Sequence, residues 1–482
     1  MTENRSLEDR AKKFIRATNS CLEGSPYTFP EDDASIMRFA AIEESVNHIA
    51  EKIGSLASMQ NLPPDLQKSL RAREVYESNA IEGLGPDLAT TSHVIEATSV
   101  VHKSNKSYVE WAVTQGIKND AHLYDVIGLT AARALSRDIA ENIDRPISES
   151  DVRAIHEIIL KDKPHSGIYK VLTNWIDGHE SHQTSLPGPD THEVMHNFVD
   201  WMNNLSRRGY RTSQSIVKAA AVHAWLTHIH PFNDGNGRLA RLLANMILAR
   251  EDMPPIILKN DAHRARYIDA LAESDKAGDI SRLIMVFCRA IERVIDDMED
   301  PELAQEMFKE DIDLRLSDEF KLWQMSLDKL HLEMSAALLL HGLKLEKLGS
   351  LSPSEYKRLR RGLKPQNSWY AKVRNRINED VGLLYFGYIE GWLQTRLEKD
   401  EHYPVLILAK NSDGISDVRP FKDIIKGDKH PVQGVTRILL QPSERKCYMW
   451  GPYFSLKKTT YEDAAKKLAL TCSEITLNRL EL

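Results

Sequence analysis

The chain has 482 residues, of which 42% are hydrophobic and 28% charged, and its formal net charge is -7. This length predicts two or three domains of roughly 100–200 residues each, and the apolar fraction excludes a globally disordered chain. The mild charge argues against a protein that coats nucleic acid, and four scattered cysteines without a CxxC pair argue against a disulfide framework or a zinc knuckle.

No targeting or membrane segment is visible in the sequence. The first residues, MTENRSLEDRAKKF, lack the apolar stretch of a secretory signal. No run approaches the ~20 apolar residues that cross a bilayer. We therefore expect a soluble, cytoplasmic protein that does not enter a membrane.

Helical periodicity dominates the N-terminal part of the chain. Apolar residues recur at i, i+3 and i+4 over residues 36–56 and 66–77. The segment SESDVRAIHEIIL begins as a capping box, with Ser148 three residues before Asp151. Residues 167–190 mix β-branched and aromatic residues with Asp-Gly and Pro-Gly-Pro turns, and they predict a β-hairpin or ordered loop.

Helices are expected again after this hairpin, in THEVMHNFVDWMNNL, SQSIVKAAAVHAWLTHI and GRLARLLANMILAR. The acidic stretch around Pro301 is typical of a linker, and residues 317–348 predict one long helix. The segments PVLILAK, VTRILLQP and KCYMWGPYFSL then predict strands, followed by a helix from Thr460.

The expected fold class is therefore mainly α. An N-terminal helical region over residues 1–105 precedes a helical core with one β-hairpin over 106–300. A helical connector over 301–400 and a small α+β module over 401–482 complete the predicted architecture.

One stretch of twelve residues, HPFNDGNGRLAR, gathers an imidazole, a carboxylate, glycines and two arginines between two predicted helices. Glycines around Asn236 let successive N–H groups converge, and the N-terminus of the next helix adds positive charge, which favours an anion. Arg238 and Arg241 rise from one helix face, so they suit a polyphosphate. Asp234 is a hard oxygen ligand for Mg²⁺, and His230 is placed to take a proton from a hydroxyl. Singly these residues are common in turns and helix ends; together they indicate phosphoryl or nucleotidyl transfer.

The stretch resembles the signature of the Fic (fido) family, HPFx[DE]GNGRxxR, at every defined position. The flanks AAAVHAWLTHI and RYIDALAESDKAGDISRLI are also similar, so the resemblance covers roughly residues 60–300. It implies a helical core with a β-hairpin flap. The implied activity is transfer of AMP from ATP to a Ser, Thr or Tyr hydroxyl of a target protein, or of the chain itself, with release of pyrophosphate.

The resemblance also implies the roles of the site residues, with ATP as substrate and Mg²⁺ as cofactor. His230 would be the base that activates the target hydroxyl, and Asp234 would hold the metal between the α- and β-phosphates. An anion hole, two arginines for the outer phosphates and a tyrosine beside the nucleotide base complete the expected site: Gly235, Asn236, Gly237, Arg238, Arg241 and Tyr267.

A second motif lies upstream, where SNAIEG, Ser78 to Gly83, resembles the family's inhibitory pattern [ST]xxxE[GN]. Glu82, near a helix end, is expected to pair bidentately with Arg241 and so to occupy the cation meant for the γ-phosphate. Ser78, four residues earlier on the same helix face, would support this contact. The alternative interpretation is an ordinary helix C-terminus with Gly83 at C′.

Two alternative functions of other classes also follow from the sequence. THEVMHNF contains HExxH, in which His192 and His196 have the spacing of a zinc metalloprotease, but no third ligand follows at a recognised spacing. The segment 356–376 carries eight Lys/Arg with interleaved aromatic residues, a pattern found in proteins that bind nucleic acid or an acidic partner and, more often, on solvated helix faces.

Further questions stay open at this level. The same site could remove AMP from a target, with Glu82 positioning a water molecule. The flap is expected to dock a target segment by strand addition, unless its side chains pack beneath the hairpin; the residues concerned are Thr173, Asn174, Trp175 and Ile176. A homodimer could gate the inhibitory helix, and neither the target protein nor the releasing signal is determined.

Overall fold

The computed structural model of the chain falls into two compact units. Unit 1 comprises Met1–Asn260 and Arg266–Gln305, and unit 2 comprises Asp261–Ala265 and Glu306–Leu482. The structure describes residues 2–97, 121–161, 163–172, 190–206, 212–260, 262–313, 318–363, 365, 368–377, 379–398, 402–410, 419–420 and 434–480.

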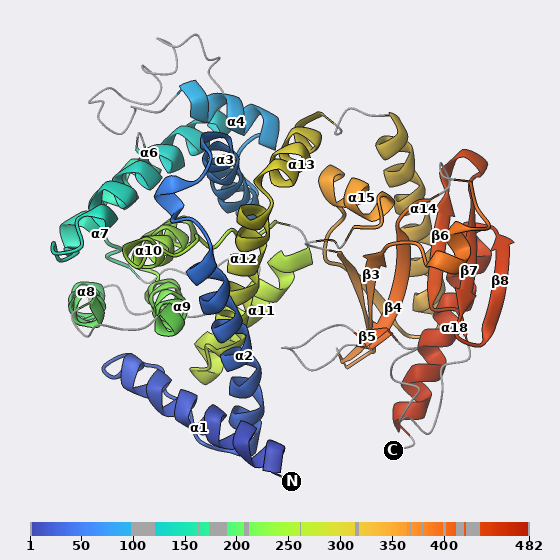
Figure 1. Cartoon of the computed structure of the whole chain (residues 1–482), viewed down its shortest axis with the longest axis horizontal. Coiled ribbons are helices and arrows are strands. Elements are labelled where there is room, and N and C mark those ends of the chain that lie inside the picture. The colour runs from blue at the N-terminus through green and yellow to red at the C-terminus, as the bar shows by residue number, and fades with distance from the viewer. Residues whose placement is uncertain are drawn as a thin grey trace. The chain divides into compact units, whose positions relative to one another are not determined.

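Unit 1 is helical throughout its described residues (Figure 1). The N-terminal elements are α1 (Thr2–Leu22), α2 (Asp33–Ser55), η1 (Met59–Asn61), α3 (Pro64–Ile81) and α4 (Leu88–Ala97). The elements that follow are α6 (Ala121–Glu141), α7 (Glu149–Ile159), α8 (Thr191–Ser206), α9 (Thr212–Ile229), α10 (Asn236–Arg250), α11 (Ala262–Ala277) and α12 (Ser281–Glu299). α13 (Pro301–Asp313) spans the sequence boundary between the units.

Local sequence signals explain several of these helix ends. The Ser148 side chain accepts from the Asp151 backbone while the Asp151 side chain accepts from the Ser148 backbone, so the predicted capping box at α7 is confirmed. α3 begins with Pro64, whose missing N–H is one that a helix start leaves unbonded anyway. α3 ends at Ile81, and Gly83 lies just beyond its C-cap Glu82 with a left-handed φ of 72°, which suits a residue without a Cβ.

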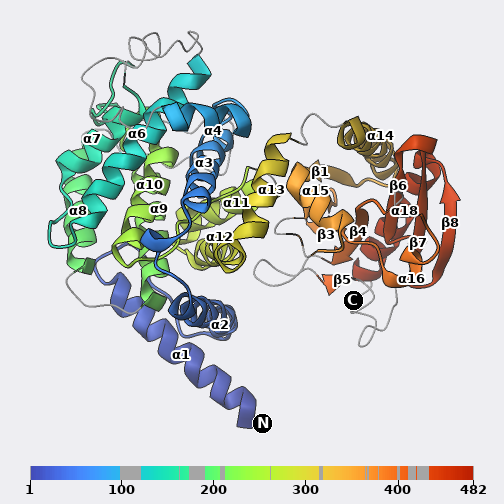
Figure 2. The same ribbon diagram turned by 45° about the horizontal axis from the view of Figure 1, so that its top comes forward.

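α10 is the central helix of unit 1. It packs against α9, α6, α7 and α3, and Figures 1 and 2 both show it enclosed by these neighbours. Its apolar side chains are almost fully buried, including Leu239, Leu243 and Leu248 at 0% exposure. A helix packed on several sides can move little, so its N-terminus is a rigid platform for a site.

Unit 2 contains an antiparallel sheet in the strand order β1-β2-β3-β4-β6-β7-β8, with β5 pairing β4. The strands are β1 (Lys344–Lys347), β2 (Trp369–Arg374), β3 (Asp380–Gly387), β4 (Val405–Lys410), β5 (Arg419–Pro420), β6 (Arg437–Gln441), β7 (Lys446–Gly451) and β8 (Phe454–Thr459). The helices are α14 (Asp318–Leu340), α15 (Pro353–Arg360), α16 (Gly391–Gln394), η6 (Pro442–Glu444) and α18 (Tyr461–Leu480).

The main core of unit 2 lies between one face of this sheet and the paired helices α14 and α18. In the register of β3 and β4, Leu384 lies opposite Leu408, and both side chains point into this core. Trp323 of α14 is fully buried there beside Phe386. The apolar segments that predicted the C-terminal strands therefore supply side chains to this core.

The mainly helical class expected from the sequence is confirmed. The predicted helix over residues 317–348 is wrong at its C-terminal end: α14 stops at Leu340, the chain turns at Gly342 with a φ of 70°, and β1 follows. The sheet thus begins inside the stretch expected to be a helical connector. Most of the predicted hairpin, and the boundary expected near residue 105, lie outside the described residues.

None of the helices in the described ranges combines the length and the apolar character that crossing a bilayer requires.

Candidate active site

The loop between α9 and α10 holds an unusual backbone conformation. His230 has a left-handed φ of 49°, rare for a residue with a Cβ, and Gly235 has a φ of 79° immediately before α10. The Asn236 side chain closes this loop: its Oδ1 accepts from Phe232 N at 3.0 Å, and its Nδ2 donates to Phe232 O at 2.7 Å. The side chain of Asn236, a residue predicted to belong to the anion hole, therefore stabilises the conformation of this loop.

His156 of α7 also supports the loop, and the sequence analysis did not single it out. Gly167 N donates to His156 Nδ1 at 2.9 Å, so the proton is on Nε2, which donates to Asp234 O at 2.8 Å. Burial lowers the pKa of His156 to about 4, so the ring is neutral near pH 7. The ring also stacks on Phe232, with centroids 3.6 Å apart. An isolated histidine in a helix gives no sequence signal of this role.

The environment of His230 keeps its imidazole neutral. Burial, with the nearby Lys170 charge, lowers the pKa of His230 to about 4. Lys170 is also buried, and its Nζ donates to Ile229 O at 3.1 Å, while its backbone N donates to Pro231 O at 2.8 Å. Burial lowers the pKa of Lys170 to about 8. Lys170, which the sequence analysis missed, thus fixes the backbone on both sides of His230.

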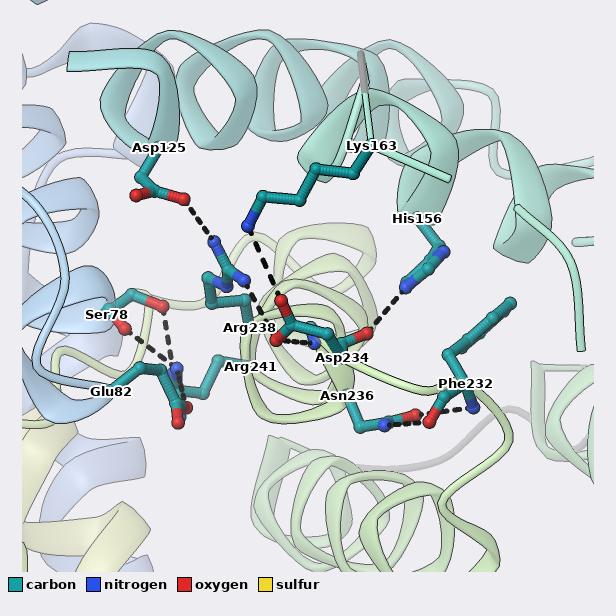
Figure 3. A network of polar contacts seen from close by, with 11 residues as sticks. Ser78, Glu82, Asp125, His156, Lys163, Phe232, Asp234, Asn236, Arg238 and Arg241 are labelled. Atoms are coloured by element: carbon teal, nitrogen blue, oxygen red, sulfur yellow. Dashed lines mark hydrogen bonds and ion pairs between the residues drawn. The ribbon is translucent and has the colours of Figure 1, made fainter. Parts of the chain in front are cut away.

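Asp234 and Arg238 form a charged chain that reaches α6 (Figure 3). Arg238 is fully buried; its Nη1 donates to Asp125 Oδ1 at 3.0 Å and its Nη2 to Asp234 Oδ1 at 3.3 Å. Lys163 Nζ lies 3.5 Å from Asp234 Oδ2. Although partial burial opposes ionisation, the charges of Arg238 and Lys163 hold the pKa of Asp234 below its usual value. The Asp234 side chain keeps 57% exposure, so it faces the open side of the loop.

Arg241 is the point where the two sequence motifs meet (Figure 3). Its Nη2 donates to Glu82 Oε1 at 2.8 Å and to Ser78 O at 2.8 Å, and its Nε donates to Ser78 Oγ at 2.9 Å. Its Nη1 donates to Tyr267 OH at 3.3 Å. The expected contact with Glu82 is therefore present, but the expected bidentate geometry is wrong, because Ser78 and Tyr267 accept the other N–H groups.

Tyr267 is 2% exposed, and its hydroxyl lies 3.0 Å from Nε2 of the buried His223. Burial, with the Arg241 charge, lowers the pKa of His223 to about 3, so this ring is neutral as well. Tyr267 thus lies between a neutral imidazole and a guanidinium, on the Arg241 side of the site. Its expected place beside a nucleotide base stays a prediction.

Gly237 leaves room for the Glu82 carboxylate. A Cβ added to Gly237 would lie 2.5 Å from Glu82 Oε1 and 3.2 Å from Arg241 Nη1. The carboxylate therefore lies directly over the first turn of α10, where free N–H groups and the helix dipole attract an anion. The structure thus brings Glu82 to the same N-terminus as residues His230 to Arg241, which we call the signature loop.

The HExxH residues do not form a metal site in the structure. His192 and His196 are exposed on α8; the first packs edge-on against Tyr169, and the second lies 3.2 Å from a Glu149 oxygen. Within the described ranges no group of three or more His, Cys, Asp and Glu residues is arranged to hold a metal ion. The flap residues Thr173 to Ile176 lie outside the described residues.

Several cations of the basic segment 356–376 pair with carboxylates of unit 2. The pairs are Lys357 and Arg361 with Glu310, Arg361 with Glu306, Arg360 with Glu319, and Arg374 with Glu346 and Asp380. Trp369 and Tyr370 are buried at 8% and 0% exposure. Paired cations and buried rings are poor contacts for nucleic acid, so the structure gives this alternative no support.

A profile of the Fic/DOC family matches residues 146–248, which run from the capped start of α7 through the signature loop into α10. The chain contains a Fic/DOC domain. The Fic/DOC profile ends inside α10 and therefore includes the loop, both arginines and the helix that supports His156, whereas Ser78 and Glu82 lie upstream of it.

Two relatives carry the name "Protein adenylyltransferase Fic". The protein of Aedes aegypti is 30% identical over 233 residues, which cover 48% of this chain and 42% of that protein. The protein of Nematostella vectensis is 30% identical over 261 residues, which cover 53% of this chain and 55% of that protein. The chain thus spans about half the length of the curated relatives it matches.

Solved structures with similar folds include a Fic domain containing signaling protein from Bacteroides thetaiotaomicron, at 23% identity and a TM-score of 0.42. The similarity covers 55% of this chain and 98% of that one. Fic-1 from C. elegans has 23% identity and a TM-score of 0.42, over 62% of this chain and 86% of that one.

Proposed function

We propose that unit 1 is a protein adenylyltransferase that transfers AMP from ATP to a hydroxyl side chain of a target protein, and that Glu82 restrains it through Arg241. The observation that carries this proposal is the arrangement around the N-terminus of α10. There His230 is neutral, and the Asp234 carboxylate is exposed. Arg241 binds the carboxylate of Glu82, which occupies a position suited to an anion. The names of the relatives support the same activity.

The proposed reaction is an in-line displacement at the α-phosphorus of ATP. His230 takes the proton of the target hydroxyl as the oxygen forms a bond to the α-phosphorus. The bond between that phosphorus and the bridging oxygen of the β-phosphate breaks, and pyrophosphate leaves with the electron pair. The N–H groups at the start of α10 and Arg241, once Glu82 has left it, would hold the polyphosphate in line for this attack.

Asp234 fits the requirements of a Mg²⁺ ligand in this reaction. Mg²⁺ in phosphate chemistry is usually held by one or two carboxylates together with substrate phosphates and water. The Asp234 carboxylate is more than half exposed, and its Oδ2 makes a long ion pair of 3.5 Å with Lys163, a weaker contact than a short hydrogen bond. Asp234 would hold Mg²⁺ there, and the metal would supply positive charge against the phosphates.

Restraint follows from competition for Arg241. The γ-phosphate of ATP and the Glu82 carboxylate are both anions that would use this guanidinium and the first turn of α10. While Glu82 stays there, ATP would bind without its outer phosphate in place, and its α-phosphorus would be out of line with His230. Because Glu82 caps α3 and is 37% exposed, it can leave without dismantling buried structure.

Mass spectrometry of the intact chain after incubation with ATP and Mg²⁺ tests the proposal. The Glu82→Gly variant should gain a mass equal to AMP, and the wild type should gain much less. The double variant Glu82→Gly with His230→Ala should gain none, although its Arg241 is equally free. An adduct of undiminished intensity in the double variant would rule out His230 as the base.

A further inference from the structure

A separate cavity lies between α3 and α6. Its volume is about 290 Å³, close to the lower end of the range for small-molecule sites, roughly 300 Å³. It is lined by Met59, Leu62, Gln67, Leu70, Arg71, Thr130, Ala131, Arg133, Ala134, Arg137, Asp138 and Pro255. All of these belong to unit 1, and the signature loop contributes none of them.

Three guanidinium groups line this cavity, and Asp138 is the carboxylate among its lining residues. Arg71 comes from α3, and Arg133 and Arg137 come from successive turns of α6. Arg133 Nε is 2.5 Å from Glu74 Oε2. Within the described part of the chain, neither Arg71 nor Arg137 has a carboxylate oxygen within ion-pair distance.

The pKa values of the cavity arginines are lowered, as expected for cations that lie close to one another. Burial, then the charges of Arg133 and Arg137, lower the pKa of Arg71. Burial, then the charge of Arg133, lowers the pKa of Arg137 in the same way. Like charges held together in a half-buried space repel each other, and an anion between them removes that repulsion.

We propose that this cavity is a binding site for a small organic phosphate, with the phosphate group between Arg71, Arg133 and Arg137. Arginine forks match phosphate oxygens in two-point contacts, which is why clusters of them select this group. The remaining wall combines apolar residues such as Met59 and Pro255 with the polar side chains of Gln67 and Thr130, so it suits the carbon and hydroxyl groups of an organic ligand better than a bare inorganic ion. The volume admits a molecule the size of a sugar phosphate.

The cavity is connected to the Arg241 contact through Glu74. A void of about 10 Å³ is lined by Glu74, Ser78, Arg133 and Arg241 together. Glu74, Ser78 and Glu82 follow each other at intervals of four residues along α3, so they share one face of that helix. An anion that draws Arg133 away from Glu74 therefore loosens α3 at the same face that holds Arg241. This regulatory step rests on the proposed function; the binding step does not.

Thermal unfolding with glucose 6-phosphate at constant ionic strength tests the binding step. We expect the ligand to raise the Tm of the wild-type chain by about 2–4 °C at several times its Kd. The Arg71→Gln, Arg137→Gln double variant should lose this shift. Lys68→Gln, which removes one exposed charge of α3 that does not line the cavity, should keep it. Equal shifts in the double variant and the wild type, or an equal shift with inorganic phosphate, would overturn the proposal.

Folding of the double variant is checked in the same experiment. Because the substitutions remove like-charge repulsion, its Tm without ligand should be no lower than that of the wild type. If its Tm is lower, the single variant Arg137→Lys is used instead of the double variant. Lysine keeps the positive charge but cannot make the two-point contact of a guanidinium, so the ligand-dependent rise in Tm should fall to half or less. An undiminished shift in Arg137→Lys then overturns the proposal.

A second measurement separates this site from the proposed function. Isothermal titration of the His230→Ala chain should show unchanged affinity for glucose 6-phosphate, because binding does not need the reaction. Glucose 6-phosphate should change the rate of AMP incorporation in the wild type and leave it unchanged in Glu82→Gly. Absence of AMP incorporation in both the wild type and Glu82→Gly would refute the proposed function, but it would not affect the conclusion that glucose 6-phosphate binds. Binding without any change in the wild-type rate would refute the coupling through Glu74.

Discussion

The signature loop of unit 1 and the basic segment 356–376 of unit 2 are similar in sequence, because each places several cations in a short run. In the basic segment the cations pair with carboxylates and the aromatic rings enter the core. In the signature loop Arg238 is enclosed by two carboxylates, whereas the carboxylate that Arg241 contacts among the described residues is the partly exposed Glu82. Cation density therefore does not identify an anion site; what matters is whether a carboxylate partner can be exchanged for a ligand.

The largest effect is expected from a substitution in the signature loop that removes the proposed base, His230. His230→Ala in the Glu82→Gly background should lower the rate of AMP incorporation by about 10²–10⁴-fold, the usual contribution of a general base. The rate is measured with labelled ATP, and ATP affinity is measured separately and should change little. Neutralising Arg361 in the basic segment is the matched control and should leave the rate as it is.

Loss of a carboxylate partner of the buried Arg238 should strongly lower the stability of unit 1. Asp125→Ala leaves the fully buried Arg238 with Asp234 as its remaining carboxylate, and breaking a buried pair costs about 3–5 kcal/mol. Calorimetry should therefore show a large fall in the Tm of unit 1. Asp328→Ala removes an exposed partner of Lys347, whose pair has side chains 64% and 43% exposed, and it should barely change the Tm. Similar shifts in the two variants would contradict the role given to Asp125.

Weakening the ion pair of Arg241 with Glu82 should increase the rate of AMP incorporation. Glu82→Gln removes a charge-assisted hydrogen bond of about 1.5–3 kcal/mol, so AMP incorporation should rise by about 10- to 150-fold. Glu96→Gln, an exposed position on α4, serves as control and should not alter the rate. A rate unchanged by Glu82→Gln would mean that Arg241 is already available in the wild type.

The pH dependence tests whether His230 is as buried in solution as in the structure. A base must be neutral, and the pKa of His230 is lowered from 6.5 to about 4. In Glu82→Gly the rate should therefore stay nearly constant from about pH 7.5 to about pH 5.5, and it should fall only as the pH approaches 4. A tenfold fall by pH 5.5 would indicate an ordinary, solvated imidazole.

The smallest effect is expected in the basic segment. Arg361→Gln breaks ion pairs whose side chains are 41% and 53% exposed with Glu306 and 41% and 12% exposed with Glu310. Such pairs contribute at most about 1 kcal/mol, so the Tm should change slightly. Salt-dependent binding of the chain to duplex DNA, measured by fluorescence anisotropy, should be undetectable in the wild type and in this variant. Strong binding that Arg361→Gln weakens would restore the nucleic-acid alternative.

Some parts of the site were predictable because they depend on local geometry. Gly235 must turn the chain into α10, and two arginines three residues apart must share a helix face. The spacing within SNAIEG likewise predicts that Ser78 and Glu82 share a face near a helix end, as they do in α3. These features arise within a few residues, so the pattern alone determines them.

Other parts were not predictable because their partners are distant in sequence. Nothing near Asp125 indicates that it pairs with Arg238, and nothing near His156 indicates that it holds the signature loop. The sequence also offers no sign that Ser78 and Tyr267 share the N–H groups of Arg241 and reduce its contact with Glu82 to one hydrogen bond. These contacts exist only because α3, α6, α7 and α11 pack around α10.

The sequence by itself determined the chemical content of the site: a base, a carboxylate, an anion-binding turn and two arginines. Only the tertiary structure decided how each charge is used. It buried His230 beside Lys170, which sets the protonation state, and it enclosed Arg238 while leaving Arg241 with an exchangeable partner. The physical reason is that pKa and pairing depend on burial and on charges from other helices, and local sequence carries no record of either.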